Sequence, residues 1–246
     1  MTGTQVIIYV CIGLLAGFMN GMFGIGGGSV GIPLLNLTGI PLLSAFAINL
    51  FVIPFTSLVS AITHRKNIDK KTAVYVIIGG SIGEVTGAIS VGLISTLILA
   101  IIFVITASTA VSAMYLDRIA PRIYRKVNPT PRNFLLFSFI LNLITGLRGG
   151  SGGSLFPPFL RVMKLDPHKA IATSVSVTIF TAIAGIMVYW KRGDIIWLPA
   201  LFVLAGSMIG ARTGSRFSLK TRGAYLEAGL AILVIGLAFI TVYKAL

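Results

Sequence analysis

The sequence has few charged residues, and very few of them are acidic. Asp, Glu, Lys and Arg make up 11% of its 246 residues, whereas about 25% is usual in soluble domains. Hydrophobic residues make up 56%, and the mean hydropathy is +0.96. A soluble globular domain is therefore excluded, and the composition predicts an all-α integral membrane protein of the cell membrane.

Cysteine is nearly absent as well. The single cysteine, Cys11, lies in the first apolar stretch, so it can form no intrachain disulfide and offers no metal site by itself. The two histidines, His64 and His168, fall in expected loops without a third ligand nearby. We therefore expect no metal and no cofactor. The first ten residues carry no basic residue, which favours a retained segment over a cleaved signal peptide.

The 20 basic residues outnumber the 6 acidic ones and give a formal charge of +14. In a soluble protein this excess would suggest a nucleic-acid partner. Here the basic residues lie in short loops between apolar segments, and no basic run alternates with aromatic residues in a polar stretch. The expected partner is the lipid bilayer, in which Lys and Arg mark the cytoplasmic loops.

A glycine-rich stretch occurs twice. NGMFGIGGGSVGIP at 20–33 corresponds to TGLRGGSGGSLFPP at 145–158. With an offset of 125 (149 − 24) the matched pairs include Gly24/Gly149, Gly27/Gly152, Gly28/Gly153, Ser29/Ser154 and Pro33/Pro158, and further on Thr56/Thr181. Later pairs such as Gly83/Gly210 and Gly87/Gly214 have an offset of 127. A repeat of this length indicates an internal duplication.

Ten apolar segments are expected, and most reach the roughly 20 residues that a spanning helix needs. Two are shorter, 28–37 and 151–163, and we expect them to be half-helices that return from a glycine break inside the membrane. The full set is 5–23, 28–37, 42–63, 72–91, 95–116, 133–147, 151–163, 167–190, 195–216 and 224–243.

Two topologies are open. If each glycine stretch only kinks one long crossing, the halves are parallel, and basic residues such as Arg161, Lys164 and Arg216 lie outside. If each stretch is the tip of a hairpin, the second half is inverted. With the N-terminus outside, every Lys and Arg then faces the cytoplasm except Arg148, Lys191, Arg192 and Lys244. The positive-inside rule favours the hairpins. We expect two inverted repeats of about five helical segments, 1–116 and 133–246, joined by a cytoplasmic linker, 117–132.

The two breaks are the expected substrate site. A helix that begins at a break directs unpaired N–H groups and the positive end of its dipole toward the break. Two such ends meeting near the midplane would bind a small anion, as in transporters with broken helices. The alternative is that the glycines only allow close helix packing. The backbone groups concerned belong to Gly26, Gly27, Gly28, Ser29, Ser151, Gly152, Gly153 and Ser154.

Side chains around the breaks complete this candidate site. Arg148 is the one cation expected deep in the membrane, where it would bind the anion directly or extend to the outer surface. Asn20, Asn49 and Ser174 would line a central cavity or hold helices together. Glu84, in the middle of its segment, is a candidate for carrying a coupling proton or pairing with Arg148.

The paired motifs resemble those of a known family. GFMNGMFGIGGGSVGIPLL and LITGLRGGSGGSLFPPFL, with HKAIATSVSVTIFTAIAG and AGSMIGARTGSRF in the second half, are similar to the sulfite exporter TauE/SafE family. Arg148 and Ser151 depart from its usual pattern. The resemblance covers nearly the whole chain and implies a transporter of sulfite, sulfoacetate or other organosulfonates. A homodimer is compatible with this expectation.

Other function classes remain open. An anion channel would use the same site. An intramembrane serine protease would use Ser151 with a histidine. His168 is the only histidine in the second half and lies at the far end of its segment, while the first half has Gly26 in place of Ser151. We therefore expect a transporter that exports its anion, and not an enzyme.

Overall fold

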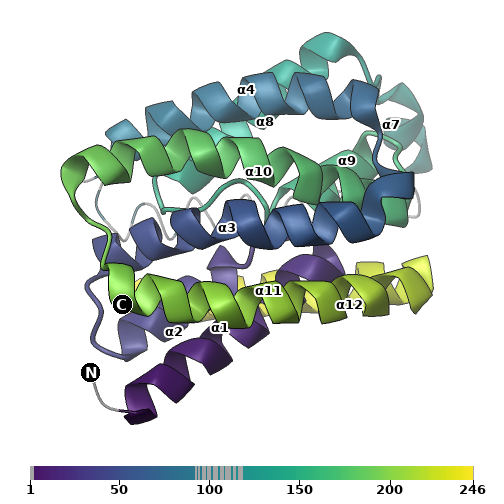
Figure 1. Ribbon diagram of the computed structural model, residues 1–246. Coiled ribbons are helices and arrows are strands. Elements are labelled where there is room, and N and C mark those ends of the chain that lie inside the picture. The colour runs from purple at the N-terminus through teal and green to yellow at the C-terminus, as the bar shows by residue number, and fades with distance from the viewer. Residues whose placement is uncertain are drawn as a thin grey trace.

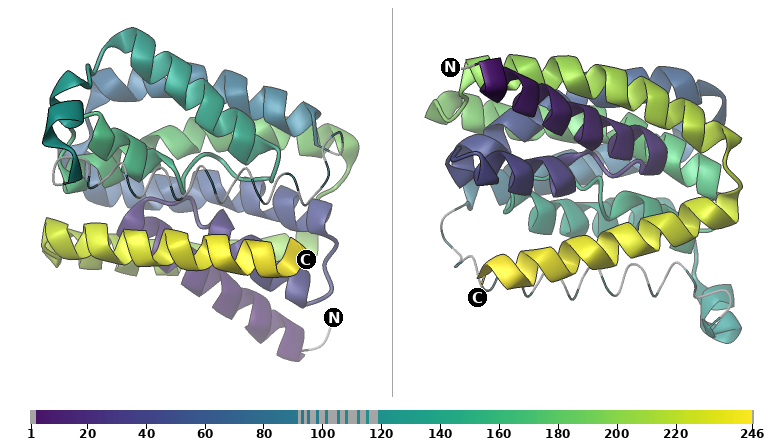
Figure 2. Two further views of the ribbon diagram at one scale, coloured as in Figure 1. Left: turned by 180° about the vertical axis from the view of Figure 1, so that it is seen from behind. Right: turned by 90° about the horizontal axis from the view of Figure 1, so that it is seen from below.

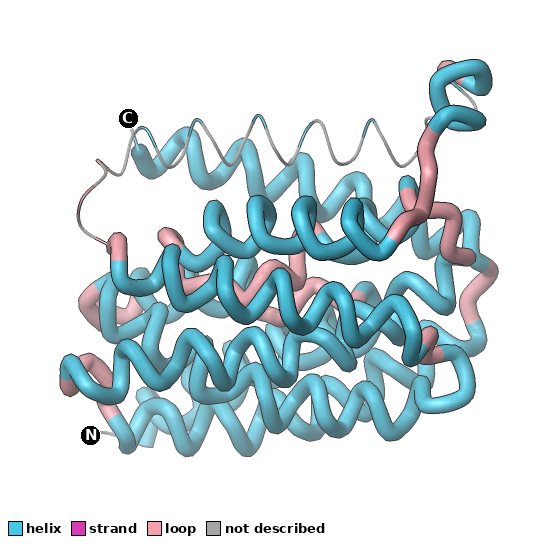
Figure 3. Tube along the Cα trace, turned by 90° about the horizontal axis from the view of Figure 1, so that it is seen from above, coloured by secondary structure: helices cyan, strands magenta, loops and turns pink. Residues whose placement is uncertain are grey.

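The computed structural model describes residues 3–91 and 119–245 with isolated positions between them, and within these residues all regular secondary structure is helical (Figure 3). The expected segment 95–116 lies outside the fully described ranges. The helices are α1 (Gly3–Phe23), α2 (Gly28–Leu37), α3 (Leu42–His64), η1 (Arg65–Asn67), α4 (Lys70–Ile89), α7 (Pro121–Lys126), α8 (Pro131–Gly146), α9 (Phe156–Val162), α10 (Pro167–Arg192), α11 (Trp197–Lys220) and α12 (Gly223–Ala245).

Several of these helices have the length and composition of membrane spans. Within the described residues, four are long and apolar enough to cross a bilayer: Gly3–Phe23, Leu42–Asn67, Lys70–Ile89 and Pro167–Arg192. Large apolar side chains such as Ile62, Ile78 and Met187 are exposed on their outer faces. The protein is thus an all-α, multi-pass membrane protein, as its composition predicts.

The helices lie side by side in one bundle (Figure 1). The described N- and C-terminal ends lie at the same end of this bundle, and two further views agree (Figure 2). The helix α3 also starts at that end, whereas α7 lies at the opposite end. The two helices on either side of the first break, α1 and α2, thus return the chain to the end of the bundle where it started.

Close packing between helices depends on glycine. An added Cβ at Gly17 of α1 would overlap the carbonyl of Ser207 in α11, and one at Gly210 of α11 would overlap the carbonyl of Leu14 in α1. The pair α4 and α8 is built similarly, since a Cβ at Gly83 would overlap the Phe139 carbonyl. Small residues let helix backbones approach in this way. The first helix of each half therefore packs along the fourth helix of the other half.

Both predicted interruptions are present. The first break (residues 24–27) separates α1 from α2, and the second break (residues 147–155) separates α8 from α9. Gly24, Gly26 and Gly27 have φ of 74°, 74° and 70°, and Gly149 and Gly152 have φ of 64° and 72°. This left-handed conformation is unfavourable for residues with a Cβ, which explains why glycine recurs here.

The second half-helix is shorter than predicted. It spans Phe156–Val162 within the predicted segment 151–163, and residues 152–155 before it form a turn in which the N–H groups of Leu155 and Phe156 both donate to the Gly152 carbonyl, at 2.9 and 3.0 Å. The prolines Pro157 and Pro158 then occupy the first turn of α9. Proline is tolerated there because the first N–H groups of a helix have no partner.

Candidate functional site

The two breaks touch each other. A Cβ added to Gly153 would lie 2.5 Å from the carbonyl carbon of Ile25 and 2.6 Å from the nitrogen of Gly26. The hydroxyl of Ser151 lies 3.1 Å from the position of a Cβ on Gly26. The two glycine stretches, 125 residues apart in the chain, therefore meet backbone to backbone.

Each break is held by a side chain of the opposite half. The Ser174 hydroxyl on α10 donates to the Gly24 carbonyl at 2.6 Å, and the Asn49 amide on α3 donates to the Gly149 carbonyl at 3.0 Å. Both donors and both acceptors are related by the same offset (174 − 49 = 149 − 24 = 125). Ser174 thus binds the opposite break, where the sequence suggested a residue lining a cavity or joining helices.

Asn20 anchors the first break to the bundle. Its side-chain oxygen accepts from the Gly26 N–H at 2.8 Å, and its amide nitrogen donates to the Ser57 hydroxyl at 3.1 Å. The Thr178 hydroxyl of α10 also donates to Ser57, at 3.0 Å. Ser57 and Thr178 were not predicted, because a lone hydroxyl in an apolar helix has no distinctive sequence signal.

The second break is anchored by Thr181, whose hydroxyl donates to the Ser151 carbonyl at 3.1 Å. Thr181 corresponds to Thr56, so the repeat itself contained a signal for it. The Ser151 hydroxyl is buried and has no hydrogen-bond partner among the described residues. It is therefore able to bind a further group at the contact between the breaks.

Several backbone donors at the breaks are unused. Among the described residues, no acceptor is present for the N–H groups of Gly27 and Ser29 at the start of α2, or for those of Ser151, Gly152, Gly153 and Ser154 in the second break. All of these residues except the partly exposed Ser29 are buried. Buried N–H groups without partners are costly, and an anion is the ligand that satisfies several of them together.

The two charged candidates are Arg148 in the second break and Glu84 on α4. Arg148 is partly buried in the second break, next to Gly149, and its N–H donates to the Thr145 carbonyl at 3.0 Å. Glu84 is fully buried on α4, with its carboxyl packed against Gly185 of α10. Neither carboxyl oxygen has a hydrogen-bond partner within the described ranges, so the suggested hydrogen-bonded pair with Arg148 is not formed there.

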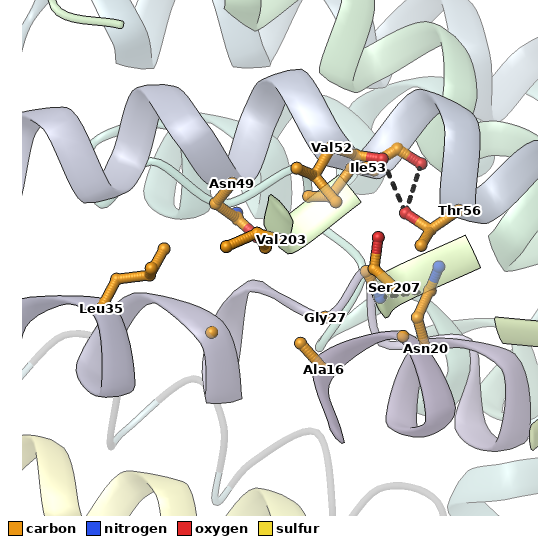
Figure 4. Close-up of a pocket in the computed structure, with 13 residues that line it drawn as sticks. Ala16, Asn20, Gly27, Leu35, Asn49, Val52, Ile53, Thr56, Val203 and Ser207 are labelled. Atoms are coloured by element: carbon orange, nitrogen blue, oxygen red, sulfur yellow. Dashed lines mark hydrogen bonds between the residues drawn. The ribbon is translucent and has the colours of Figure 1, made fainter. Parts of the chain in front are cut away.

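A small cavity of about 20 Å³ lies behind the first break (Figure 4). In this view Asn49 extends from α3 and Asn20 from α1 toward the space between the two helices. Four predicted residues contribute to the walls: Asn20, Gly26, Gly27 and Asn49. The other walls come from Ala16, Gly17, Gly31, Leu35, Val52, Ile53, Thr56, Val203 and Ser207. The remaining predicted residues, Gly28, Ser29, Arg148, Ser151, Gly152, Gly153, Ser154 and Ser174, do not line it.

Comparison with known proteins agrees with a transport function. The family model described as "Sulfite exporter TauE/SafE" matches residues 9–241. A probable membrane transporter protein of Methanocaldococcus jannaschii, MJ0441, is 30% identical, with 92% of each chain covered. The probable membrane transporter protein YunE of Bacillus subtilis is 26% identical, covering 94% of this chain and 95% of its own. No solved structure matches. The chain belongs to the sulfite exporter TauE/SafE family of membrane transporters.

Proposed function

We propose that the protein is a secondary transporter that exports small sulfur-containing anions, such as sulfite, sulfoacetate or other organosulfonates. The observation that carries this proposal is the set of buried backbone N–H groups without acceptors at the two touching breaks. Sulfonate and sulfite oxygens are acceptors that can bind several such donors at once. The name of the matching family supports the same substrate class.

The proposed site combines both breaks. Free backbone donors come from Gly27, Ser29 and residues 151–154, and Asn20, Asn49 and Ser174 hold the backbone that carries them. Arg148 supplies the full positive charge next to the second break, where its planar guanidinium can donate two parallel hydrogen bonds to an oxyanion. Since the breaks touch, an anion at their contact requires them to separate during transport.

We further propose that residues 1–116 and 133–246 are inverted repeats on either side of a cytoplasmic linker, 117–132. The reciprocal hydrogen bonds of Ser174 and Asn49 support a two-fold relation between the halves. The position of α7 at the end of the bundle opposite the described N-terminal end supports the inversion. Labelling of single cysteines in the linker should occur only from the cytoplasmic side, and labelling from outside intact cells would contradict the proposal.

Transport without a catalytic step is favoured over proteolysis by the positions of Ser151 and His168. The Ser151 carbonyl is bound by Thr181, which lies 13 residues (181 − 168) after His168 on the same helix α10. At 1.5 Å per residue this places His168 about 20 Å away along the helix. A serine–histidine pair requires hydrogen-bonding distance.

Purified protein in proteoliposomes tests the function. We expect the uptake of radiolabelled sulfite or sulfoacetate to saturate with concentration. Unlabelled anion on the opposite side of the membrane should accelerate this uptake by exchange. Flux that rises linearly with concentration and shows no exchange would indicate an anion channel. Absence of flux for every sulfur anion, with flux of carboxylates instead, would contradict the proposed substrate class.

A further inference from the structure

A second group of buried polar side chains lies between α4 and α10. Glu84 on α4 and Tyr189 on α10 are both fully buried. The two carboxyl oxygens of Glu84 and the hydroxyl of Tyr189 have no hydrogen-bond partner among the described residues. Buried polar atoms without partners are rare because they are costly. An ionisable group at such a place in a membrane protein is a candidate for a functional role.

The two side chains meet at one turn of α10. A Cβ at Gly185 would lie 2.7 Å from a carboxyl oxygen of Glu84, so the carboxyl occupies the space that a side chain at 185 would take. Tyr189 follows Gly185 by four residues on α10. Helical side chains lean toward the N-terminus of their helix and cover the preceding turn. The Tyr189 hydroxyl is therefore directed toward the Glu84 carboxyl, which acts on it electrostatically.

An exposed ion pair lies at the other end of this group. Arg192 and Asp194 also act electrostatically on the Tyr189 hydroxyl. The Arg192 Nε lies 3.1 Å from the Asp194 Oδ2, with 36% and 20% of the two side chains exposed. The guanidinium is also 5.6 Å from the centre of the Tyr189 ring. The helix α10 ends at the same end of the bundle as the described N-terminal end (Figure 1), which is the outer side in the proposed topology.

The duplication does not account for this group. By the offset of 127, the counterpart of Glu84 is Ala211, and by the offset of 125, the counterpart of Tyr189 is His64 (189 − 125). Neither member is thus repeated in kind. A buried carboxyl facing a buried tyrosine was therefore placed here by substitution after the duplication.

The surroundings of Glu84 suit a proton better than a metal ion. From α8 the backbone of Gly146 approaches that of Glu84, and neither Gly146 nor Gly185 has a side chain to offer. Tyr189 is the titratable side chain that faces the carboxyl from α10. Hard metal cations need several oxygen ligands, and the described part of the chain has no group of three or more His, Cys, Asp or Glu that could hold one. A proton needs only the carboxylate itself.

We propose that Glu84 binds a coupling proton and that Tyr189 passes protons to it from the outer end of the bundle, where the Arg192–Asp194 pair lies. A tyrosine hydroxyl both donates and accepts. It gives its proton to the Glu84 carboxylate and accepts another from water beside Asp194, so one proton enters and the tyrosine ends unchanged. This inference rests on the proposed function, to which it adds the proton as the second transported ion, entering as the sulfur anion leaves.

Infrared spectroscopy of the purified protein tests this path without a substrate. The carbonyl band of a protonated carboxyl shifts when deuterium replaces its proton, and subtracting the spectrum of Glu84→Gln identifies the band of Glu84. After transfer to D₂O, the shift should be about tenfold or more slower in Tyr189→Phe than in wild type, because a proton-transfer group is lost. Tyr75→Phe removes a hydroxyl from a partly buried position on α4 and should behave as wild type.

Two results would overturn the proposal. Equal exchange rates in Tyr189→Phe and wild type would exclude the tyrosine from the path, and a Glu84 without a protonated band at neutral pH would not be a proton site. Tyr189→Phe should fold, because it keeps the ring and loses a hydroxyl that bonds to no described residue. If gel filtration shows that it does not, Asp194→Asn tests the exposed end of the path. This variant should also slow the exchange, and an unchanged rate would contradict the path.

Proteoliposomes connect the path to transport. The carboxyl of sulfoacetate is ionised at neutral pH, as those of Asp and Glu are, so this substrate carries no proton itself. A sulfoacetate gradient should drive protons in the opposite direction, recorded by a trapped pH dye. In Tyr189→Phe this proton movement should be about tenfold slower, while sulfoacetate exchange at equal concentrations continues.

The outcomes separate this inference from the proposed function. If wild type exchanges sulfoacetate without moving protons, the proposed function stands and the coupling proton is wrong. If wild type transports no sulfur anion but deuterium reaches Glu84 more slowly in Tyr189→Phe, the substrate class fails and the proton path stands.

Discussion

The two halves of the molecule place similar backbones around different side chains. In the first half, Gly31 lines a small cavity behind the break. In the second half its counterpart at position 156 (31 + 125) is a phenylalanine, whose ring packs against Gly152 and Gly80. The residue before the first break is the buried Phe23, whereas its counterpart at position 148 (23 + 125) is an arginine. The comparison shows that duplication preserved the glycine geometry, while substitution left space in one half and placed charge in the other.

The largest expected effect comes from removing the charge that distinguishes the second break. Arg148→Ala should weaken binding of the sulfur anion by about 2–5 kcal/mol, because it removes a charged partner from a partly buried site. This corresponds to roughly 30-fold to several thousandfold in affinity. Arg148→Lys should restore binding only in part, since an ammonium lacks the planar pair of donors. Calorimetric titration with sulfite at one salt concentration measures both.

Ser154→Ala is the matched comparison in the same break. Its backbone N–H remains, so we expect a smaller loss than for Arg148→Ala. An affinity of Arg148→Ala within about threefold of wild type, less than 1 kcal/mol, would show that the arginine is a surface anchor. A larger loss for Ser154→Ala would mean that the breaks bind the anion without the charge.

A second difference between the halves is Glu84, whose counterpart on α11 (84 + 127) is Ala211. If this buried carboxyl carries a coupling proton, Glu84→Gln should abolish the stimulation of sulfite flux by an imposed pH gradient. Exchange of sulfite at equal concentrations in the same proteoliposomes should continue, because it needs no net proton movement. Full stimulation in the variant would assign Glu84 a packing role against Gly185.

The contact between the breaks can be tested by adding one methyl group. Gly153→Ala should destabilise the protein by about 1–3 kcal/mol, because the new Cβ would overlap the backbone of Ile25 and Gly26. The melting temperature should fall by several degrees, at roughly 2–4 °C per kcal/mol for a chain of this size. Scanning fluorimetry of the purified protein measures the shift.

Gly150→Ala is the control for that measurement. It lies in the same break, and the nearest heavy atom to its added Cβ would be 3.4 Å away. Its melting temperature should stay near that of wild type. Equal shifts for the two variants would mean that the loop is sensitive as a whole, and that the contact between breaks has no special part in stability.

The smallest effect concerns one of the two reciprocal hydrogen bonds. Ser174→Ala removes the donor to the Gly24 carbonyl and should cost about 1 kcal/mol. Thr213→Ala removes an exposed hydroxyl that donates only to the Ile209 and Gly210 carbonyls of its own helix. Its effect on stability should therefore be smaller. Thermal unfolding of the two variants compares them, and equal stability would indicate that the bond across the halves contributes little.

Much of the fold could be read from the chain itself. The apolar segments predicted the helices, and the two runs of glycine predicted where α1 and α8 end, because positive φ angles are favourable mainly for glycine. The offset of 125 also relates Asn49 to Ser174 from the sequence alone. The first residue of α9 is harder to predict from the sequence, since the turn at residues 152–155 depends on local hydrogen bonds that an apolar pattern does not reveal.

The sequence by itself determined the membrane class, the family and the positions of the breaks, because composition, periodicity and glycine act locally along the chain. Only the tertiary structure decided that the breaks touch and that Ser174 and Asn49 bind the Gly24 and Gly149 carbonyls of the opposite halves. It also decided that the Phe156 ring packs against Gly152. The contact between the breaks and the two hydrogen bonds join residues about 100 to 150 positions apart. They depend on how closely the helices pack, which no local pattern specifies.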